Sequence, residues 1–161
     1  MSKPFSWEAF NKIPVVGIMR NIPQAQVEMI VSQYYEAGFT TLEVTMNSEG
    51  AAKTISYLSE IYTDTLNVGA GTVLTLEDLD EALTAGANFI VTPIVNEDVI
   101  KICVARKVPV FPGAYTPTEI YKAWSMGAAM VKVFPDPVTP KRVWYFSPAN
   151  IPSVSWLIAS G

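Results

Sequence analysis

Met130-Val131-Lys132-Val133-Phe134-Pro135 is the stretch that most strongly indicates how this chain folds. Its β-branched and aromatic residues predict a short buried strand, which follows a helix end near Gly127 and is closed by a proline. A strand of a parallel sheet is covered on both faces, so its side chains are expected to be apolar throughout. Lys132 breaks that rule, and because side chains alternate along a strand it points the same way as Met130 and Phe134.

A lysine in such a place has a distinctive chemistry. Loss of hydration disfavours the ammonium form and lowers the pKa of the amine. A neutral amine is what Schiff-base formation with a ketone requires. The alternative is a lysine near a strand end whose ammonium group reaches water along its aliphatic stem.

Further apolar runs recur along the chain at a regular spacing. Their starts lie roughly 19 to 27 residues apart, the length of one strand and one helix with short loops. This repetition predicts a parallel α/β protein, either an open doubly wound sheet or a (β/α)8 TIM barrel. A dinucleotide-binding sheet needs a GxGxxG turn after its first strand, and the chain lacks one there, so the barrel is favoured. The predicted strands before Lys132 are Val15–Arg20, Leu42–Met46, Asn67–Thr72, Phe89–Pro93 and Val108–Pro112.

The segments between these runs contain residues typical of helix starts and helix ends. Residues suited to the first turn of a helix, by capping or as proline, are followed about one helix length later by glycine, which ends a helix readily in the left-handed conformation. The expected starts are at Pro23, Thr75, Asn96 and Thr116, and the expected ends include Gly38, Gly86 and Gly127.

Polar residues gather near the carboxyl ends of the predicted strands, where a barrel places its chemistry. Glu43 is a second charge inside an apolar strand, and it shares its face with Thr45. Three buried or strand-end charges in one barrel favour a common pocket, although Glu43 and Lys132 could also form a buried structural salt bridge and Arg20 could be a solvated rim residue. The residues expected at the strand ends are Arg20, Glu43, Thr72, Thr92, Pro93, Lys132 and Phe134.

Composition narrows the class of protein. The 161 residues contain no histidine, which removes Ser-His-Asp and Cys-His mechanisms and the common histidine-based metal sites. The net charge of -4 argues against a nucleic-acid or anionic-membrane partner. The chain has no apolar run long enough to span a membrane and no signal-peptide core at its start, and Cys103 is its single cysteine. We therefore expect one cytoplasmic domain over residues 1–161.

Five motifs, in order and in register over roughly residues 10 to 136, resemble 2-keto-3-deoxy-6-phosphogluconate aldolase and its 6-phosphogalactonate relative. The motifs are Leu42-Glu43-Val44-Thr45-Met46-Asn47-Ser48, Val68-Gly69-Ala70-Gly71-Thr72-Val73-Leu74, Val91-Thr92-Pro93, Phe111-Pro112-Gly113 and Val131-Lys132-Val133-Phe134-Pro135.

The resemblance implies a class I aldolase on a (β/α)8 barrel. Such an enzyme cleaves 2-keto-3-deoxy-6-phospho sugar acids to pyruvate and glyceraldehyde 3-phosphate, needs no metal or other cofactor, and is usually a homotrimer. The resemblance makes Lys132 the Schiff-base lysine and Glu43 the acid-base residue, and it places Thr72, Pro93 and Phe134 around pyruvate.

The substrate carboxylate needs a cation, and the bidentate guanidinium of arginine suits it. The gluconate-type enzymes have an arginine where this chain has Asn47, so Arg20 is the candidate here. The choice between the gluconate and galactonate epimers stays open.

The end of the chain departs from the pattern of the family. Residues Asp136 to Ser160 contain no glycine, whereas the family has a seventh strand with a Gly-Gly phosphate loop and an eighth strand. We therefore expect a barrel truncated or incomplete after the sixth strand, with Lys141 and Arg142 as the first candidates for any phosphate contact. The alternative function is an aldolase-like scaffold or binding protein whose catalysis is impaired because it lacks that loop.

Overall fold

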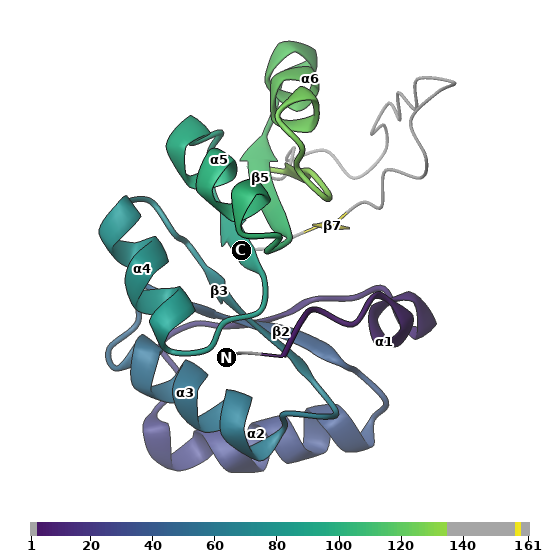
Figure 1. Ribbon diagram of the computed structural model, residues 1–161. Coiled ribbons are helices and arrows are strands. Elements are labelled where there is room, and N and C mark those ends of the chain that lie inside the picture. Colours follow the sequence, from purple (N-terminus) through teal and green to yellow (C-terminus); the bar gives the residue numbers. More distant parts are fainter. Residues whose placement is uncertain (1–2, 135–156, 159–161) are drawn as a thin grey trace.

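The computed structural model describes residues 3–134 and 157–158, and its strands form one parallel sheet (Figure 1). Each strand pairs with the next one along the chain, so the spatial order follows the sequence. This is the order of a barrel wall, whereas a doubly wound sheet reverses its order at a switch point. The protein is therefore an α/β fold whose strands form part of a TIM-like barrel. The strands are β1 Gly17–Met19, β2 Thr41–Thr45, β3 Asn67–Gly71, β4 Ile90–Thr92, β5 Val110–Ala114, β6 Lys132–Val133 and β7 Leu157–Ile158.

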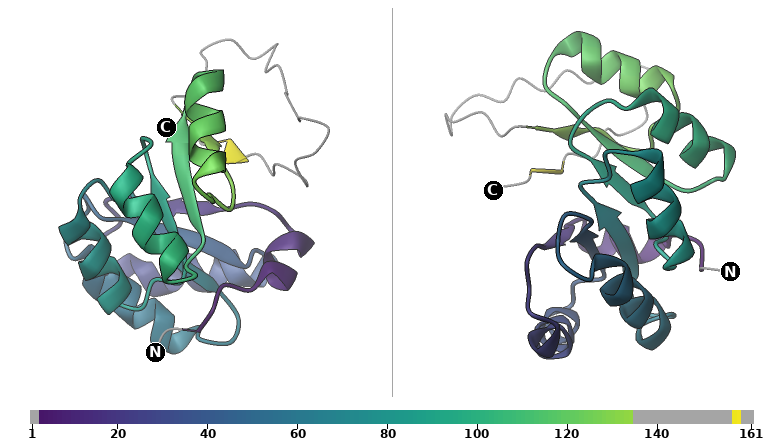
Figure 2. Two further views of the ribbon diagram at one scale, coloured as in Figure 1. Left: turned by 45° about the horizontal axis from the view of Figure 1, so that its top comes forward. Right: turned by 90° about the vertical axis from the view of Figure 1, so that its left-hand side faces the viewer.

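Five helices cover one side of the sheet, and a short one lies toward the other side, as the two further views in Figure 2 also show. Among the described residues, no helix has the length and apolar character needed to cross a membrane. The covering helices are α2 Gln24–Glu36, α3 Ala51–Ile61, α4 Leu76–Thr84, α5 Glu97–Ala105 and α6 Pro117–Ser125, and the short helix is α1 Trp7–Lys12.

The predicted helix starts and helix ends are confirmed. Thr75 and Thr116 each form a capping box with the acidic residue three positions later, and the side chain of Asn96 accepts bonds from two backbone N–H groups. Gly38, Gly86 and Gly127 all have positive φ just beyond helix ends. Local sequence therefore sets the limits of most of the helices that hold the strands in place.

The alternation of side chains along the strands separates two buried clusters. The larger cluster lies between the sheet and the covering helices and includes Leu42 and Val44 of β2. The second cluster lies on the inner face of the sheet and consists of Phe5, Phe10, Val16, Phe89, Val91, Phe111 and Met130. We call it the inner aromatic cluster, because Phe5, Phe10, Phe89 and Phe111 pack against one another within it.

Helix α1 was not predicted from the sequence, and the buried amide of Asn67 anchors the segment that contains it, together with a hydrogen bond from the Thr40 hydroxyl to the carbonyl of Ala9. Asn67, at the start of β3, accepts a hydrogen bond from the backbone N–H of Ser6 at 2.7 Å. Its amide group donates to the carbonyl of Ser6 at 3.0 Å and to the hydroxyl of Thr41 at 3.1 Å. These bonds hold the N-terminal segment over the amino ends of the strands, where Phe5 and Phe10 complete the inner aromatic cluster.

The described strands form part of a TIM-like barrel, as expected, and one further short strand, β7, follows the sixth. Strand β7 pairs in parallel with β6, with Lys132 opposite Leu157 and Val133 opposite Ile158. Backbone pairing needs no glycine, so the composition that argued against a phosphate loop did not argue against a strand. Lys141, Arg142 and the expected Gly-Gly loop position lie outside the described residues.

Candidate active site

Lys132 opens β6 and points to the inner face of the sheet. Its neighbour Met130 belongs to the inner aromatic cluster, while Val131 packs in a cluster with Ala123 of α6, so the predicted alternation holds. Only 6 % of Lys132 is exposed. Its Nζ atom lies 4.9 Å from the centroid of the Phe134 ring, a cation–π distance.

Burial lowers the pKa of Lys132 below its ordinary value, because desolvation penalises the ammonium ion. The negative charge of Glu43 acts in the opposite direction, and the positive charge of Arg20 adds to the lowering. The low exposure of Lys132 argues against the alternative of a strand-end lysine whose ammonium group reaches water.

Glu43 lies at the centre of β2 and faces the same interior. Its neighbours Leu42 and Val44 pack toward the helices, so the carboxyl group points inward and only 2 % of the residue is exposed. Its Oε2 atom is buried without a hydrogen-bond partner among the described residues. Burial raises the pKa of Glu43 to about 7, outweighing the opposing influences of Lys132 and Arg20.

Glu43 and Lys132 influence each other without forming a contact ion pair. The salt bridges within 4.0 Å in the described part of the chain all join side chains that are more than a third exposed, and this pair is not among them. A buried pair kept for structure needs close contact and satisfied hydrogen bonds to offset its desolvation. The unpartnered Oε2 atom of Glu43 argues against that structural interpretation.

Arg20 follows β1 directly and is exposed, with the charge of its side chain acting on both Glu43 and Lys132. The loop that carries it is tied to the end of β2. The backbone N–H of Asn21, a residue with φ 52°, donates to the hydroxyl of Ser48 at 2.9 Å. That hydroxyl lies 2.8 Å from the hydroxyl of Thr45. This link between two loops is a tertiary contact and leaves no signal in the sequence of either loop.

Thr72, directly after β3, is half-buried and has φ 56°. A β-branched residue rarely takes this left-handed conformation, and such strain concentrates at functional sites. Thr72 directly follows Gly71, whose α-carbon approaches the carboxyl group of Glu43.

Pro93 follows β4, and its backbone lies against β5. A Cβ added at Gly113 would meet the Pro93 carbonyl oxygen at 2.4 Å, so only glycine permits this approach. Gly113 is in turn the register partner of Lys132. Thr92 does not join the site, because its hydroxyl donates to the carbonyl of Ile94 at 2.5 Å and its face is that of Ile90, which packs toward the helices.

Of the six predicted site residues, the structure places Arg20, Thr72 and Pro93 directly after β1, β3 and β4, Glu43 in the middle of β2, and Lys132 and Phe134 in and just after β6. Three of them, Arg20, Glu43 and Lys132, act on one another electrostatically. An amine, a carboxyl group and a guanidinium on one inner face can bind a keto acid, form an imine and move protons. Among the described residues, no group of three or more His, Cys, Asp or Glu side chains is arranged to hold a metal ion.

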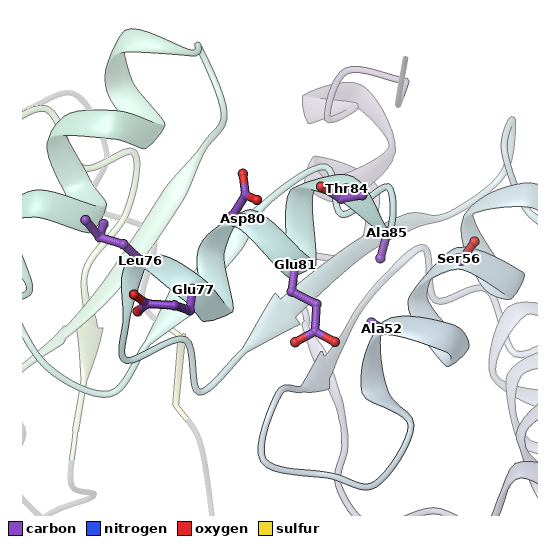
Figure 3. Close-up of a pocket in the computed structure, with 8 residues that line it drawn as sticks. All are labelled: Ala52, Ser56, Leu76, Glu77, Asp80, Glu81, Thr84 and Ala85. Carbon is purple, nitrogen blue, oxygen red and sulfur yellow. The ribbon is translucent and has the colours of Figure 1, made fainter.

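A groove of about 780 Å³ lies elsewhere, between α3 and α4 on the helix side of the sheet (Figure 3). Helix α4 contributes acidic side chains to it, and Figure 3 shows Glu81 extending toward Ala52 of α3 while Asp80 points away. None of its lining residues is one of the predicted site residues. A row of carboxylates on the outer surface is an ordinary solvated face, so we do not assign the chemistry there.

Comparison with known proteins agrees with this geometry. Residues 8–140 match the protein family described as KDPG and KHG aldolase. The chain is 35 % identical over 124 residues to 2-dehydro-3-deoxy-6-phosphogalactonate aldolase of Escherichia coli (strain K12), covering 77 % of this chain and 60 % of that protein. It is 33 % identical over 129 residues to 2-dehydro-3-deoxy-phosphogluconate aldolase of Treponema pallidum (strain Nichols), covering 80 % and 61 %.

Solved structures give the same result. A native KDPGal structure superposes with a TM-score of 0.75 at 32 % identity, over 84 % of this chain and 63 % of that one. KDPG aldolase from Legionella pneumophila, with pyruvate captured as a covalent carbinolamine intermediate, superposes with a TM-score of 0.72 at 25 % identity, over 79 % and 61 %. The chain spans about 60 % of the length of the curated relatives named above. The match over residues 8–140 shows that this chain belongs to the KDPG and KHG aldolase family.

Proposed function

We propose that the protein is a class I aldolase that cleaves a 2-keto-3-deoxy-6-phospho sugar acid to pyruvate and glyceraldehyde 3-phosphate. The observation that carries the proposal is the burial of Lys132 on the inner face of the sheet, which also carries the buried carboxyl group of Glu43 with its pKa raised to about 7. The relatives described above are aldolases of such acids, which supports the same substrate class and gives no support to a non-catalytic scaffold.

The reaction begins at Lys132. Its neutral amine adds to the C2 ketone, giving a carbinolamine whose hydroxyl leaves as water, so that a protonated imine remains. The solved relative from Legionella pneumophila holds pyruvate as a carbinolamine, which supports this first step. A lowered pKa keeps a larger fraction of Lys132 neutral at physiological pH.

Glu43 moves the protons, directly or through one water. As an acid it protonates the departing hydroxyl of the carbinolamine, and as a carboxylate it accepts the proton of the C4 hydroxyl. The electrons of the C3–C4 bond then move into the imine, releasing the aldehyde and leaving an enamine of pyruvate on Lys132. Protonation at C3 and hydrolysis return pyruvate and the free amine. A pKa of about 7 makes both forms of Glu43 available near neutral pH.

The remaining site residues bind the substrate. Arg20 pairs with the substrate carboxylate through its bidentate guanidinium group. Thr72, Pro93 and Phe134 surround the three carbons that become pyruvate. We extend the proposal to a homotrimeric (β/α)8 barrel in the cytoplasm, with the expected strand order supported by the consecutive pairing of β1 to β7.

The test is an assay of pyruvate release from both epimers of the phosphorylated keto-deoxy acid. Lys132→Arg is expected to abolish turnover while the fold survives, because arginine stays protonated and cannot form the imine. Glu43→Gln is expected to slow turnover by roughly 10² to 10⁴-fold, the usual range for a lost proton shuttle. Unchanged turnover in either variant would contradict the proposal.

A further inference from the structure

We propose that Gly71 is a positioning residue, whose missing side chain leaves the space in which the carboxyl group of Glu43 is held toward Lys132. The inference rests on the proposed function, since it explains how the proton-transfer group of that reaction is placed.

The sheet register brings the two residues together. Strands β2 and β3 are neighbours, with Glu43 opposite Gly69 and Thr45 opposite Gly71. Gly71 is therefore the diagonal neighbour of Glu43 on the same inner face, one step nearer to the carboxyl ends of the strands. Diagonal neighbours in a sheet lie within reach of a long side chain such as glutamate.

The carboxyl group occupies the place where a side chain at Gly71 would be. A Cβ added there would lie 2.6 Å from Cδ and Oε1 of Glu43 and 3.1 Å from Oε2. These are the three nearest atoms, and all belong to this one carboxyl group. Because Gly71 does not have positive φ, alanine meets no conflict with the backbone conformation there, and the nearest obstacle to its Cβ is the carboxyl group of Glu43.

Gly69, the other glycine on this face of β3, makes room for a different side chain. A Cβ added at Gly69 would meet the ring of Phe89 at 2.4 Å, so Gly69 makes room for a rigid side chain of the inner aromatic cluster. At Gly71 the obstacle is the far end of a flexible chain, which can swing aside. Alanine at Gly71 is thus expected to leave the fold intact and to displace the reacting group.

The experiment measures turnover and stability for Gly71→Ala, Glu43→Ala and the double variant. Gly71→Ala is expected to lower kcat by about 10²-fold with little change in KM, since a misplacement near 1 Å of a reacting group costs about that much. In the Glu43→Ala background the same glycine substitution is expected to cost less than about 2-fold, because no carboxyl group remains to be displaced. Glu43→Asp, one C–C bond shorter, is expected to relieve part of the conflict, so that Gly71→Ala costs less than about 10-fold in that background.

Two results would overturn the inference. One is a Gly71→Ala variant as active as the wild type, and the other is an equal loss of kcat with and without the Glu43 carboxyl group. If Gly71→Ala alone does not fold, the double variant with Glu43→Ala decides, since a double variant that also fails to fold points to another obstacle. The Gly69→Ala variant serves as the matched control and is expected to lose stability in both backgrounds.

A failure of the proposed function looks different. A wild-type protein that releases no pyruvate and traps none would remove the aldolase activity. The thermal stabilities of the same four proteins would still show whether Gly71 makes room for Glu43, because a coupling between the two substitutions needs no substrate.

Discussion

Asn67 and Glu43 lie on neighbouring strands and on the same inner face, yet the buried polar atoms of Asn67 have hydrogen-bond partners and one of those of Glu43 does not. The amide of Asn67, at the amino ends of the strands, exchanges hydrogen bonds with Ser6 and Thr41. The Oε2 atom of Glu43, one step toward the carboxyl ends, is buried without a partner among the described residues. A buried polar group without a partner costs free energy, and native structures retain few of them.

The same contrast extends to the surroundings of the two residues. The amino ends hold the inner aromatic cluster, which is apolar and close-packed. The middle and carboxyl parts of the sheet hold two buried ionisable groups, Glu43 and Lys132, and a strained Thr72. Asn88, just before β4, also has a buried oxygen without a partner, so unpaired polar atoms are not confined to one end of the sheet. What distinguishes the middle and carboxyl parts is that their unfavourable features are ionisable or strained, and we infer that they serve the proposed reaction.

The largest expected effect on stability comes from the amino ends. Phe111→Ala removes a ring that is fully buried and packs against Phe5 and Phe89. We expect the free energy of unfolding to fall by about 3 to 5 kcal/mol. Pyruvate trapping by the protein that remains folded should be largely retained, because Phe111 belongs to the inner aromatic cluster and is not among the residues proposed to bind pyruvate. Urea titration checks the first expectation and adduct yield the second.

Ile61→Ala is the matched control for Phe111→Ala, since Ile61 is 56 % exposed and its loss should cost less than about 0.5 kcal/mol. Equal losses in the two variants would contradict the assignment of stability to the inner aromatic cluster.

The next effect comes from the carboxyl group of Glu43. Its pKa is about 7 in the folded protein, compared with 4.5 for a solvated glutamate in an unfolded chain, so folding favours its neutral form. The loss of unfolding free energy caused by ionising the buried carboxyl group is absent below pH 4.5, grows as the pH rises to about 7, and reaches about 3 kcal/mol. We expect Glu43→Gln, which cannot ionise, to gain stability relative to the wild type over that pH range. Parallel profiles of unfolding free energy against pH for the two proteins would contradict a buried, unpaired Glu43.

The smallest effect concerns the backbone at Thr72. Thr72→Gly removes the side chain that makes φ 56° unfavourable, and we expect a gain of about 1 kcal/mol in unfolding free energy. The same variant should bind pyruvate more weakly, because the residue lies beside the site. A stability gain with weaker binding would show that the strain is retained for function, whereas a loss of stability would show that Thr72 is not strained.

The sequence predicted the parts of this arrangement that depend on local rules. Alternation along the strands put Lys132 and Glu43 on the inner face, and capping residues such as Thr75 set the helix starts. It did not predict helix α1, which has only six residues and depends on the tertiary contact with Asn67. Nor did it predict the closeness of Gly71 to Glu43, because that contact depends on the register between β2 and β3, which neither strand specifies by itself.

The most direct test of the account is reduction with borohydride in the presence of pyruvate, followed by peptide mass spectrometry. We expect one covalent adduct on Lys132, because this amine is buried and its pKa is lowered, and no adduct in Lys132→Arg. The more exposed Lys101 and Lys122 should stay unmodified and serve as internal controls. An adduct on a surface lysine, or none at all in correctly folded protein, would contradict the account.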